Sequence, residues 1–588
     1  MKLSDYVIEF IQKKGVSHVF EFIGGAIVHL LDSVSLRDDI ECVSVRHEQA
    51  GAFAAEAYAR MNGELGVAMA TSGPGALNLL TGIGSCYFDS VPCLFITGQV
   101  NTYEYKFDRP IRQIGFQETD IVSVAKSLTK YAELVTDPEK IRFYLEKAVY
   151  LAQNGRPGPV LLDIPMNIQR ANINPDELES FFDSQEYLNQ MNEEPVVFEQ
   201  LEYIISLIKD AKRPLVLVGG GIRLSNACEQ LEQFLDKTGL PLASSLMGLD
   251  VIPHDNPQYV GLIGSYGNRY SNLVLANSDL LIILGSRLDS RQTGTRPDTF
   301  ARAAKKIHVD IDSLELNSKV QVDVSIQADL RSFLTSLNDA LDSYERADIS
   351  EWYGKINVLK ERYPTYSFDP IANEIEPNRF MQLLSSKCKD FGSICLDVGQ
   401  HQMWASQSYK ISKGQRLLNS GGMGAMGFAL PAAIGAALAD KREVLVIAGD
   451  GGIQLNIQEL DTITRLNLPV KIVVLNNSSL GMVRQFQDLY MDGRQQSTVN
   501  KNPSFIDIAR AYGIPSYRVD SKEDLTVIDD FLSIQGPSFL EVILKKNTEV
   551  HPKLVVNRPI EDMFPYLERD ELKKLMQIDL VEEMEIPK

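Results

Sequence analysis

The chain has 588 residues, of which 44% are hydrophobic, and its formal net charge is −20. A charge of this sign and size argues against a nucleic-acid partner, because phosphate neutralisation needs clustered Lys and Arg side chains. No uncharged apolar run is as long as a membrane-spanning helix, so we expect no membrane segment. At about 100–200 residues per domain, the length predicts about three to five domains.

The N-terminus begins with Met1–Asp5 and leads directly into Tyr6, Val7, Phe10 and Ile11, which have amphipathic helical spacing. This pattern predicts a helix of the folded protein in place of a signal peptide. The six cysteines are scattered and form no Cys-x-x-Cys pair, so we expect buried, reduced thiols. Together these features predict a soluble, cytoplasmic protein.

Short apolar runs rich in β-branched residues alternate with helical patterns along the chain. This alternation is typical of α/β folds with parallel sheets. Each run ends at or just before a Gly, a Pro or a small polar residue, as do strands buried on both faces. The predicted strands are Gly66–Ala70, Cys93–Thr97, Val160–Ile164, Leu215–Val218, Leu280–Leu284, Val444–Ala448 and Lys471–Leu475.

Two polar stretches, Asp183–Glu194 and Asp339–Asp369, predict domain boundaries. They divide the chain into domains at 1–180, 190–345 and 360–550, followed by a tail at 551–588. The first and third of these blocks both close with a Gly-Pro turn and a strand, at Gly158–Ile164 and Gly536–Val542. This echo favours an internal duplication, with coincidence as the alternative, because Gly-Pro before a strand is common.

The first candidate functional residue is Glu48, which follows the apolar run Val43–Val45 and precedes a helix of small residues, Gly51 to Arg60. Acidic residues are favoured at helix starts by the helix dipole. The local sequence alone therefore indicates a structural role for Glu48.

The strongest local pattern is a buried strand, Val444–Ala448, that runs into Gly449-Asp450-Gly451-Gly452. A helical pattern and a second buried strand follow, and that strand ends in Asn476-Asn477. The two strands of such a unit are parallel neighbours, so Asp450 and Asn477 should meet at one sheet edge. A carboxylate, an amide oxygen and a backbone carbonyl suit Mg²⁺, and the glycines let backbone N–H groups approach phosphates. The pattern predicts a magnesium–diphosphate site, with a plain turn as the alternative.

Gly-Asp-Gly, 24 residues (452–475) and Asn-Asn together resemble the motif that binds thiamine diphosphate. The segment Arg46–Gln49 resembles the His-Glu-Gln segment of the acetolactate synthase family, and the likeness spans nearly the whole chain. It implies an α/β fold of three doubly wound parallel-sheet domains: a pyrimidine-binding domain, a central FAD/Rossmann-like domain and a diphosphate-binding domain. It also implies a homodimer or homotetramer whose active sites lie between subunits.

The resemblance assigns a role to Glu48, which would polarise the pyrimidine ring of the coenzyme. Met426 would wedge between the two coenzyme rings, with ordinary core filling as the alternative. Mg²⁺ would be held by Asp450, Asn477 and Ser479. The other implied coenzyme contacts are Gly25, Ala26, Pro74, Asn78, Gly399, Gln400, His401, Gly424, Gly451, Gly452, Gly481, Met482 and Val483.

The central domain contains segments that resemble the FAD-binding residues of acetolactate synthases, so we expect bound FAD, with a vestigial site as the alternative. These residues are Gly219, Gly220, Gly221, Gly285, Ser286, Arg287, Asp289, Arg291 and Asp310. In the family, the arginine that matches Arg291 approaches the carboxylate of the second 2-oxo acid, a task suited to a guanidinium fork. A flavin or interdomain contact is the equally weighted alternative.

Phe116 and Gln117 resemble the residues that shape the family's pocket and bond the intermediate. Phe486 departs from the family, because anabolic members carry a tryptophan there that favours 2-oxobutyrate as acceptor. The segment Tyr103–Arg112 is a few residues longer than usual and adds Lys106, Asp108, Arg109 and Arg112. The segment Asn557–Met576 resembles relatives from sugar biosynthesis. A basic loop would suit a phosphorylated or nucleotide-linked acceptor, and a solvated surface loop is the alternative.

The resemblance thus predicts a transferase that decarboxylates pyruvate and passes the two-carbon unit to a carbonyl acceptor, a second 2-oxo acid. A keto-sugar nucleotide as acceptor, simple decarboxylation, flavin-dependent oxidation and C–C hydrolysis are the enzymatic alternatives. A non-catalytic paralogue is a further alternative. The presence of Glu48, Asp450 and Asn477 in one chain argues against it.

Overall fold

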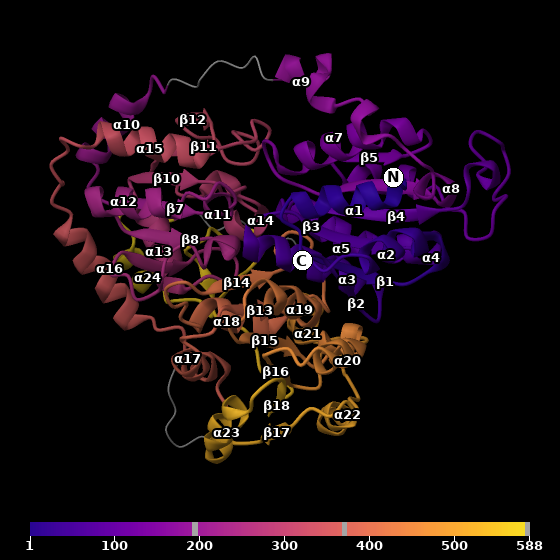
Figure 1. Cartoon of the computed structure of the whole chain (residues 1–588). Coiled ribbons are helices and arrows are strands. Elements are labelled where there is room, and N and C mark those ends of the chain that lie inside the picture. Colours follow the sequence, from indigo (N-terminus) through magenta and orange to yellow (C-terminus); the bar gives the residue numbers. More distant parts are fainter. Residues whose placement is uncertain (191–197, 367–372, 582–588) are drawn as a thin grey trace.

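The computed structural model describes residues 1–190, 198–366 and 373–581. Three six-stranded parallel sheets with flanking helices form its body (Figure 1). All seven predicted strands are present, and the alternation of apolar runs with helical patterns is confirmed as an α/β fold. The predicted boundary stretches extend into residues 191–197 and 367–372, which lie outside the described residues. Within the described ranges, no helix is both long and apolar enough to cross a bilayer.

The first domain is built on the sheet β2-β1-β3-β4-β6-β5, in which all neighbours are parallel. Its strands are β1 (His18–Phe22), β2 (Glu41–Ser44), β3 (Gly66–Ala70), β4 (Cys93–Gln99), β5 (Tyr131–Leu134) and β6 (Val160–Pro165). Its helices are α1 (Leu3–Lys13), α2 (Val28–Ser35), α3 (Glu48–Asn62), α4 (Pro74–Asn78), α5 (Leu80–Asp89), α6 (Ile121–Ala125), α7 (Ile141–Gln153), α8 (Met166–Gln169) and α9 (Gln185–Gln190).

The third domain repeats that strand order in the sheet β14-β13-β15-β16-β18-β17. Its strands are β13 (Ser393–Leu396), β14 (Arg416–Asn419), β15 (Val444–Gly449), β16 (Val470–Asn476), β17 (Ser516–Val519) and β18 (Ser538–Ile543). Its helices are α17 (Pro377–Lys387), α18 (Gln400–Ser408), α19 (Ala429–Ala439), α20 (Leu460–Arg465), α21 (Gly481–Tyr490), α22 (Phe505–Ala511) and α23 (Val527–Ser533). The two Gly-Pro turns precede β6 and β18, which hold the same place in the two sheets. The similarity in the sequence thus corresponds to a similarity in sheet topology.

The central domain has the strand order β12-β11-β10-β7-β8-β9, which is the order of a dinucleotide-binding Rossmann sheet. Its strands are β7 (Pro214–Val218), β8 (Leu242–Ser244), β9 (Tyr259–Leu262), β10 (Leu280–Leu284), β11 (Lys305–Asp310) and β12 (Val324–Gln327). Its helices are α10 (Leu201–Asp210), α11 (Gly221–Leu224), α12 (Cys228–Thr238), α13 (Arg269–Asn277), α14 (Ser290–Thr293), α15 (Leu330–Ala340) and α16 (Ser350–Arg362).

The segment after the third sheet folds back onto the central domain. It forms the small antiparallel pair β19 (Lys553–Leu554) and β20 (Met563–Phe564) and the helix α24 (Arg569–Leu575). Ile560, Leu572 and Met576 join the hydrophobic core of the central domain. The buried Glu561 is paired with Arg302 at 2.8 Å, so its charge is compensated.

Helices α3 and α19 hold the first and third domains together. Both helices are rich in buried Ala and Gly, which allows the two backbones to approach closely. A methyl group at Gly435 would overlap the backbone of Ala54. A second bridge is Arg46, whose guanidinium pairs with Asp461 at 2.6 Å and whose backbone N–H donates to Glu459. The start of α3 is therefore fixed against the third domain.

One detail differs from the sequence prediction. The connection between β15 and β16 is not one regular helix but a 3₁₀ segment, Ile453–Glu459, followed by α20. Asn456 breaks the regular backbone, and its side-chain amide donates to Gly427 O at 2.8 Å and to Gln49 Oε1 at 3.1 Å. These tertiary hydrogen bonds outweigh the apolar periodicity that favoured a continuous helix.

Candidate active site

Asp450 and Asn477 lie at the same edge of the third sheet, as the sequence pattern predicted. The register of β15 and β16 pairs Gly449 with Leu475, so Asp450 follows one strand where Asn476 ends the other. Asp450 is buried, and its Oδ2 accepts hydrogen bonds from the side-chain amides of Asn500 (2.9 Å) and Asn502 (2.8 Å). Burial raises the pKa of Asp450, and these hydrogen bonds oppose that rise.

The side chain of Asn477 is oriented by its neighbours. Its amide N–H donates to Gln400 Oε1 at 2.9 Å, and its Oδ1 accepts the backbone N–H of Ser479 at 3.2 Å. Ser479 is held in turn, because its hydroxyl donates to Thr498 O. Gly481 lets the Gln400 side chain pack against the backbone, since a methyl group there would overlap the side-chain carbonyl and displace it. Gln400, Asn477 and Gly481 thus form one packed unit at the start of α18 and α21.

The donor set fits a magnesium ion. A carboxylate at Asp450, an amide oxygen at Asn477 and a backbone carbonyl at Ser479 are hard oxygen ligands, and they leave room for phosphate oxygens. The described residues contain no group of three or more His, Cys, Asp and Glu side chains that could hold a metal. A magnesium ion at this edge would therefore depend on amide, backbone and phosphate oxygens beside the single carboxylate.

A neutral histidine lines the same edge. The ring of His401 packs against Gly399 and Gly449, where a Cβ atom would lie 2.7 Å from it. Burial lowers the pKa of His401 to about 3, so the imidazole is uncharged at neutral pH. Its buried Nε2 has no hydrogen-bond partner among the described residues. Buried polar atoms are normally satisfied, so this unmatched nitrogen is consistent with a ligand at the site.

The segment 420–429 carries Gly424 and Met426 to the glycine turn after β15. The methyl carbon of Met426 lies 3.5 Å from the position that a Cβ atom on Gly451 would occupy. Gly424 has a φ of +67° and open space beside it. Asp397 fixes the end of the segment by accepting the backbone N–H groups of Gly427 (2.9 Å) and Ala429 (3.3 Å). The segment is therefore held in place beside the predicted phosphate-binding turn.

Glu48 occupies the first turn of α3, where His47 caps the helix by accepting the N–H of Gln49. Its carboxylate is buried and accepts a hydrogen bond from Asn78 Nδ2 at 2.9 Å. Pro74 starts α4, which brings Asn78 to Glu48. In the described part of the chain no hydrogen bond joins the Glu48 carboxylate to the third domain. Glu48 and Asp450 are thus oriented by separate sets of hydrogen bonds, one in the first domain and one in the third, and we refer to them as two half-sites.

Gly25 and Ala26 adjoin the same edge of the first sheet. The N–H of Ala26 donates to the Thr71 hydroxyl at 3.1 Å, which ties the turn after β1 to the loop after β3. Gly25 has open space where a side chain would stand. This turn leaves a clear face near the loop that precedes Asn78.

The loop between β4 and α6 carries Phe116 and Gln117 and extends away from the first sheet (Figure 1). Gln117 contacts Gly73, where a Cβ atom would lie 3.0 Å from its side chain, so Gln117 lies beside the loop that leads to Asn78. Phe116 is 85% exposed. Glu118 shapes the loop by accepting backbone N–H groups of Lys106 (2.7 Å) and Ile114 (2.6 Å).

The predicted substrate residue Phe486 lies on the outer face of α21 with Val483, and both are exposed. Met482 packs partly against the core of the third domain. The ring of Phe486 contacts Tyr490 at 4.6 Å between centroids. The Tyr490 hydroxyl accepts the backbone N–H of Val556, so the segment after the third sheet adjoins this wall.

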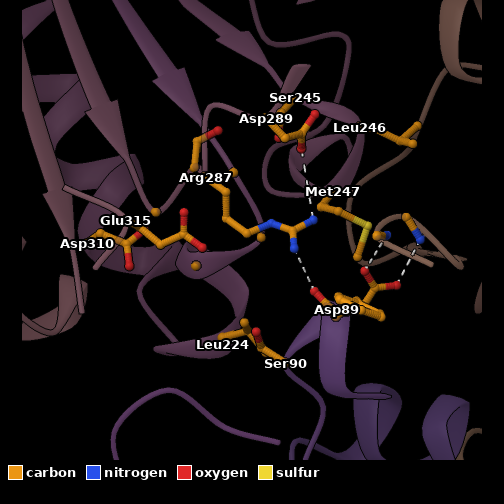
Figure 2. Close-up of a pocket in the computed structure, with 18 of the residues that line it drawn as sticks. Asp89, Ser90, Leu224, Ser245, Leu246, Met247, Arg287, Asp289, Asp310 and Glu315 are labelled. Atoms are coloured by element: carbon orange, nitrogen blue, oxygen red, sulfur yellow. Dashed lines mark hydrogen bonds and ion pairs between the residues drawn. The ribbon is translucent and has the colours of Figure 1, made fainter. Parts of the chain in front are cut away.

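All nine residues predicted to contact FAD line one pocket of about 900 Å³ between the three domains (Figure 2). The glycines allow its walls to approach, because a Cβ atom at Gly219 or Gly221 would overlap or crowd the backbone of Gly285. Asp310 stands at the end of β11, at the carboxyl edge of the central sheet, where ligands bind in open α/β sheets. The volume and the acidic strand end fit a dinucleotide.

Arg291 also lines this pocket and is exposed. Its backbone N–H is capped by Asp289, and its carbonyl accepts the N–H of Ser265 at 2.7 Å. These contacts fix the backbone and leave the guanidinium on the pocket wall. This position suits either of the two predicted roles of Arg291, acceptor binding and flavin contact.

Sequence reasoning missed four residues that shape the site: Asp89, Asp397, Asn500 and Asn502. Asp397 directly follows Ile394–Leu396, an apolar run typical of a buried strand, and its place at the strand end could have identified it. The paired amides of Asn500 and Asn502 have no such signal, because only the fold brings them to Asp450, about fifty positions away in sequence. Asp89 was hidden for the same reason.

Comparisons with known proteins match all three domains. Residues 1–124, 201–337 and 397–542 match the family models described as the N-terminal TPP binding domain, the central domain and the C-terminal TPP binding domain of thiamine pyrophosphate enzymes. Acetolactate synthase 2, chloroplastic, of Nicotiana tabacum is 41% identical over 578 residues, covering 96% of this chain and 85% of the tobacco protein.

Two further relatives agree with this match. Acetolactate synthase, chloroplastic, of Arabidopsis thaliana is 40% identical over 94% of this chain and 83% of its own length. Acetolactate synthase 2, chloroplastic, of Zea mays is 38% identical over 96% of this chain and 88% of its own length. With this identity over almost the whole length and the fold described above, the chain belongs to the acetolactate synthase family of thiamine-diphosphate-dependent enzymes.

Proposed function

We propose that this enzyme decarboxylates pyruvate and transfers the resulting two-carbon unit to a second 2-oxo acid, as the names of its relatives indicate. The observation that carries the proposal is the pair of half-sites: a buried carboxylate at Glu48 beside Asn78, and an Asp450–Asn477 edge fitted for a metal and a diphosphate. When bound, thiamine diphosphate supplies the carbon nucleophile and the electron sink for loss of CO₂.

Each half-site has its own task in this proposal. Glu48 would hold the pyrimidine ring through a charge-assisted hydrogen bond, and Asn78 fixes the orientation of that carboxylate. Met426 would support the coenzyme from the side of Gly451. Asp450, Asn477 and the carbonyl of Ser479 would hold Mg²⁺, whose charge would neutralise the diphosphate.

We infer that the large pocket binds FAD. The inference is supported by its volume of about 900 Å³, by the close glycine backbones and by Asp310 at the strand end. A flavin here would contact all three domains, because Tyr87, Arg287 and Gly424 line the same cavity. The pocket would therefore stabilise the domain arrangement when filled.

We also infer a homo-oligomer of at least two chains. The support is a set of apolar side chains that are exposed on the elements carrying the two half-sites: Ile23, Leu77, Phe116, Leu455, Val483 and Phe486. Exposed clusters of this kind mark protein interfaces. A second copy would bring the Glu48 half-site of one subunit to the Asp450 edge of the other and cover these side chains.

A second acceptor class is suggested by the loop 103–112, which exposes Arg109 and Arg112 a few positions before Phe116 and Gln117 in the sequence. Guanidinium groups bind phosphate oxygens bidentately, so a keto-sugar nucleotide would find partners here. In this second candidate the decarboxylation of pyruvate is unchanged and only the acceptor differs.

The experiment is product analysis. Purified protein with Mg²⁺, thiamine diphosphate and FAD is given pyruvate alone, pyruvate with 2-oxobutyrate, or pyruvate with a nucleotide-linked keto sugar, and products are identified by mass. Acetolactate or acetohydroxybutyrate supports the first proposal, and a branched sugar nucleotide supports the second. Acetaldehyde or acetate as the only product would refute both and identify a decarboxylase or an oxidase.

A further inference from the structure

Two buried carboxylates hold the segment that carries Gly424 and Met426. Asp397 binds its C-terminal end from within the third domain, at Gly427 and Ala429. Asp89 binds its N-terminal end from the first domain: Oδ2 accepts the N–H of Gly421 at 2.8 Å and Oδ1 accepts the N–H of Gly422 at 2.7 Å. Both carboxylate oxygens of Asp89 are thus used on a segment of another domain.

The position of Asp89 is strongly constrained. It is the last residue of α5, which ends where Ser90 adopts a φ of +59°. Its carboxyl is buried, and burial raises its pKa, while Arg60 and the N–H groups of Gly421 and Gly422 oppose the rise. A buried carboxylate is tolerated only when hydrogen bonds and charge replace its lost hydration. The contact with the glycines is therefore tied to the fold of both domains.

The same contact forms part of the wall of the large pocket. Asp89, Gly421, Gly422 and Gly424 all line it, and the central domain adds Arg287, which donates to Phe88 O at 2.9 Å (Figure 2). A Cβ atom at Gly422 would lie 2.8 Å from Phe88 Cβ and 3.1 Å from Arg287 Nη2. A ligand that orders this wall acts on the hydrogen bonds that place the Met426 segment.

We propose that Asp89 is a positioning residue that fixes the segment 421–426 and thereby couples occupancy of the large pocket to the binding of thiamine diphosphate. The proposal rests on the roles inferred above for Met426 and for the pocket. Asp89 touches neither ligand in this scheme. It acts through the backbone of Gly421 and Gly422, so a disturbed Asp89 weakens the coenzyme site while Asp450 and Asn477 stay in place.

The test is titration calorimetry of the full-length protein, freed of bound cofactors, with thiamine diphosphate at saturating Mg²⁺, with and without added FAD. Asp89→Asn keeps the size of the side chain but turns an N–H donor toward one of the two glycine N–H groups. We expect its dissociation constant for thiamine diphosphate to rise about tenfold or more. In the wild type, FAD should tighten thiamine diphosphate binding by about 5- to 150-fold, and the variant should lose most of that factor.

Two further variants keep the result interpretable. Glu146→Gln is the matched control, because Glu146 is equally buried and accepts three hydrogen bonds, from Arg142, Ser180 and Phe181, none of which reaches another domain. It should leave both the affinity and the coupling unchanged. Gly422→Ala keeps the Asp89 side chain, but the added methyl group crowds Phe88, Asp89 Oδ1 and Arg287, and the variant should reproduce the effect of Asp89→Asn.

The possible results are distinct. An Asp89→Asn protein that binds thiamine diphosphate within twofold of the wild type and keeps the full effect of FAD would overturn the proposal. A wild type that binds no FAD would refute the flavin assignment and the coupling, whereas a weakened affinity in the variant would still support positioning by Asp89. A wild type that binds no thiamine diphosphate would refute the coenzyme site itself.

Discussion

The side-chain amide of Asn502 donates a hydrogen bond to Asp450 Oδ2 at 2.8 Å and a second one to Asn476 Oδ1 at 3.0 Å. One residue thus links the ends of both strands, β15 and β16, that form the proposed metal edge. Asn500 adds a parallel bond to the same carboxylate oxygen. The orientation of Asp450 is therefore set by two amides that the loop after α21 supplies.

Removing these amides should loosen the metal site without destroying it. Asn502→Ala leaves Asp450 with the bond from Asn500, and we expect Mg²⁺ affinity to fall about 10-fold, as it does when residues that orient a ligand are lost. Titration calorimetry with Mg²⁺ in the presence of thiamine diphosphate measures this. A variant that binds Mg²⁺ as tightly as the wild type would show that the amides do not position Asp450.

Removing the carboxylate itself should have a larger effect. Asp450→Ala deletes the only charged ligand proposed for Mg²⁺, so we expect the affinities for Mg²⁺ and thiamine diphosphate to fall at least about 100-fold. Asp440→Ala is the control, because its half-buried carboxylate pairs with Arg442 of the same domain, away from the proposed metal edge in the sequence. Unchanged cofactor affinity in Asp450→Ala would rule out the metal assignment.

Glu48→Gln separates binding from turnover. The glutamine keeps the size of the side chain and a hydrogen bond with Asn78 but cannot carry the negative charge. We expect turnover of pyruvate to fall about 10²- to 10⁴-fold, while thiamine diphosphate still binds. Steady-state kinetics and calorimetry on the same preparation test both parts. Near-normal turnover would remove Glu48 from the mechanism.

Phe486→Trp probes the acceptor. The larger ring should fill the space beside Tyr490 and favour 2-oxobutyrate over pyruvate as acceptor by about tenfold, the usual scale of discrimination in an apolar pocket. Competition between the two acceptors, followed by mass analysis of the products, gives the ratio. An unchanged ratio would place Phe486 outside the acceptor pocket.

Titration of the buried Asp163 should contribute to the pH dependence of the protein's stability. It accepts hydrogen bonds from Thr97 and Gln99, and burial raises its pKa to about 7. The folded chain then holds a proton that the unfolded chain has lost, so this group makes the fold less stable as pH rises from about 4 to 7. Between pH 5 and 7, the melting temperature of Asp163→Asn should fall by several degrees less than that of the wild type. Equal slopes for variant and wild type would contradict the assignment.

Much of this fold could be predicted because the information is local. The strands around Val444 and Lys471 are buried on both faces, so their continuous apolar runs identify them in the sequence. Their parallel pairing then places Asp450 and Asn477 at the same sheet edge. Asn456 shows where local reasoning fails: its hydrogen bonds to Gln49 and Gly427 reach across the fold and break the expected helix. Asp89 and Asn502 were hidden for the same reason, because their partners lie far away in the sequence.

The central claim is that Glu48 and Asp450 of different subunits serve one coenzyme, and mixing two inactive variants tests it. Glu48→Gln and Asp450→Ala chains are unfolded and refolded together, or coexpressed, and mixed dimers are verified by native mass spectrometry. If the site lies between subunits, each mixed dimer has one site with both residues intact, and random pairing should restore about a quarter of wild-type activity. Verified mixed dimers with no more activity than the two parents would contradict the claim.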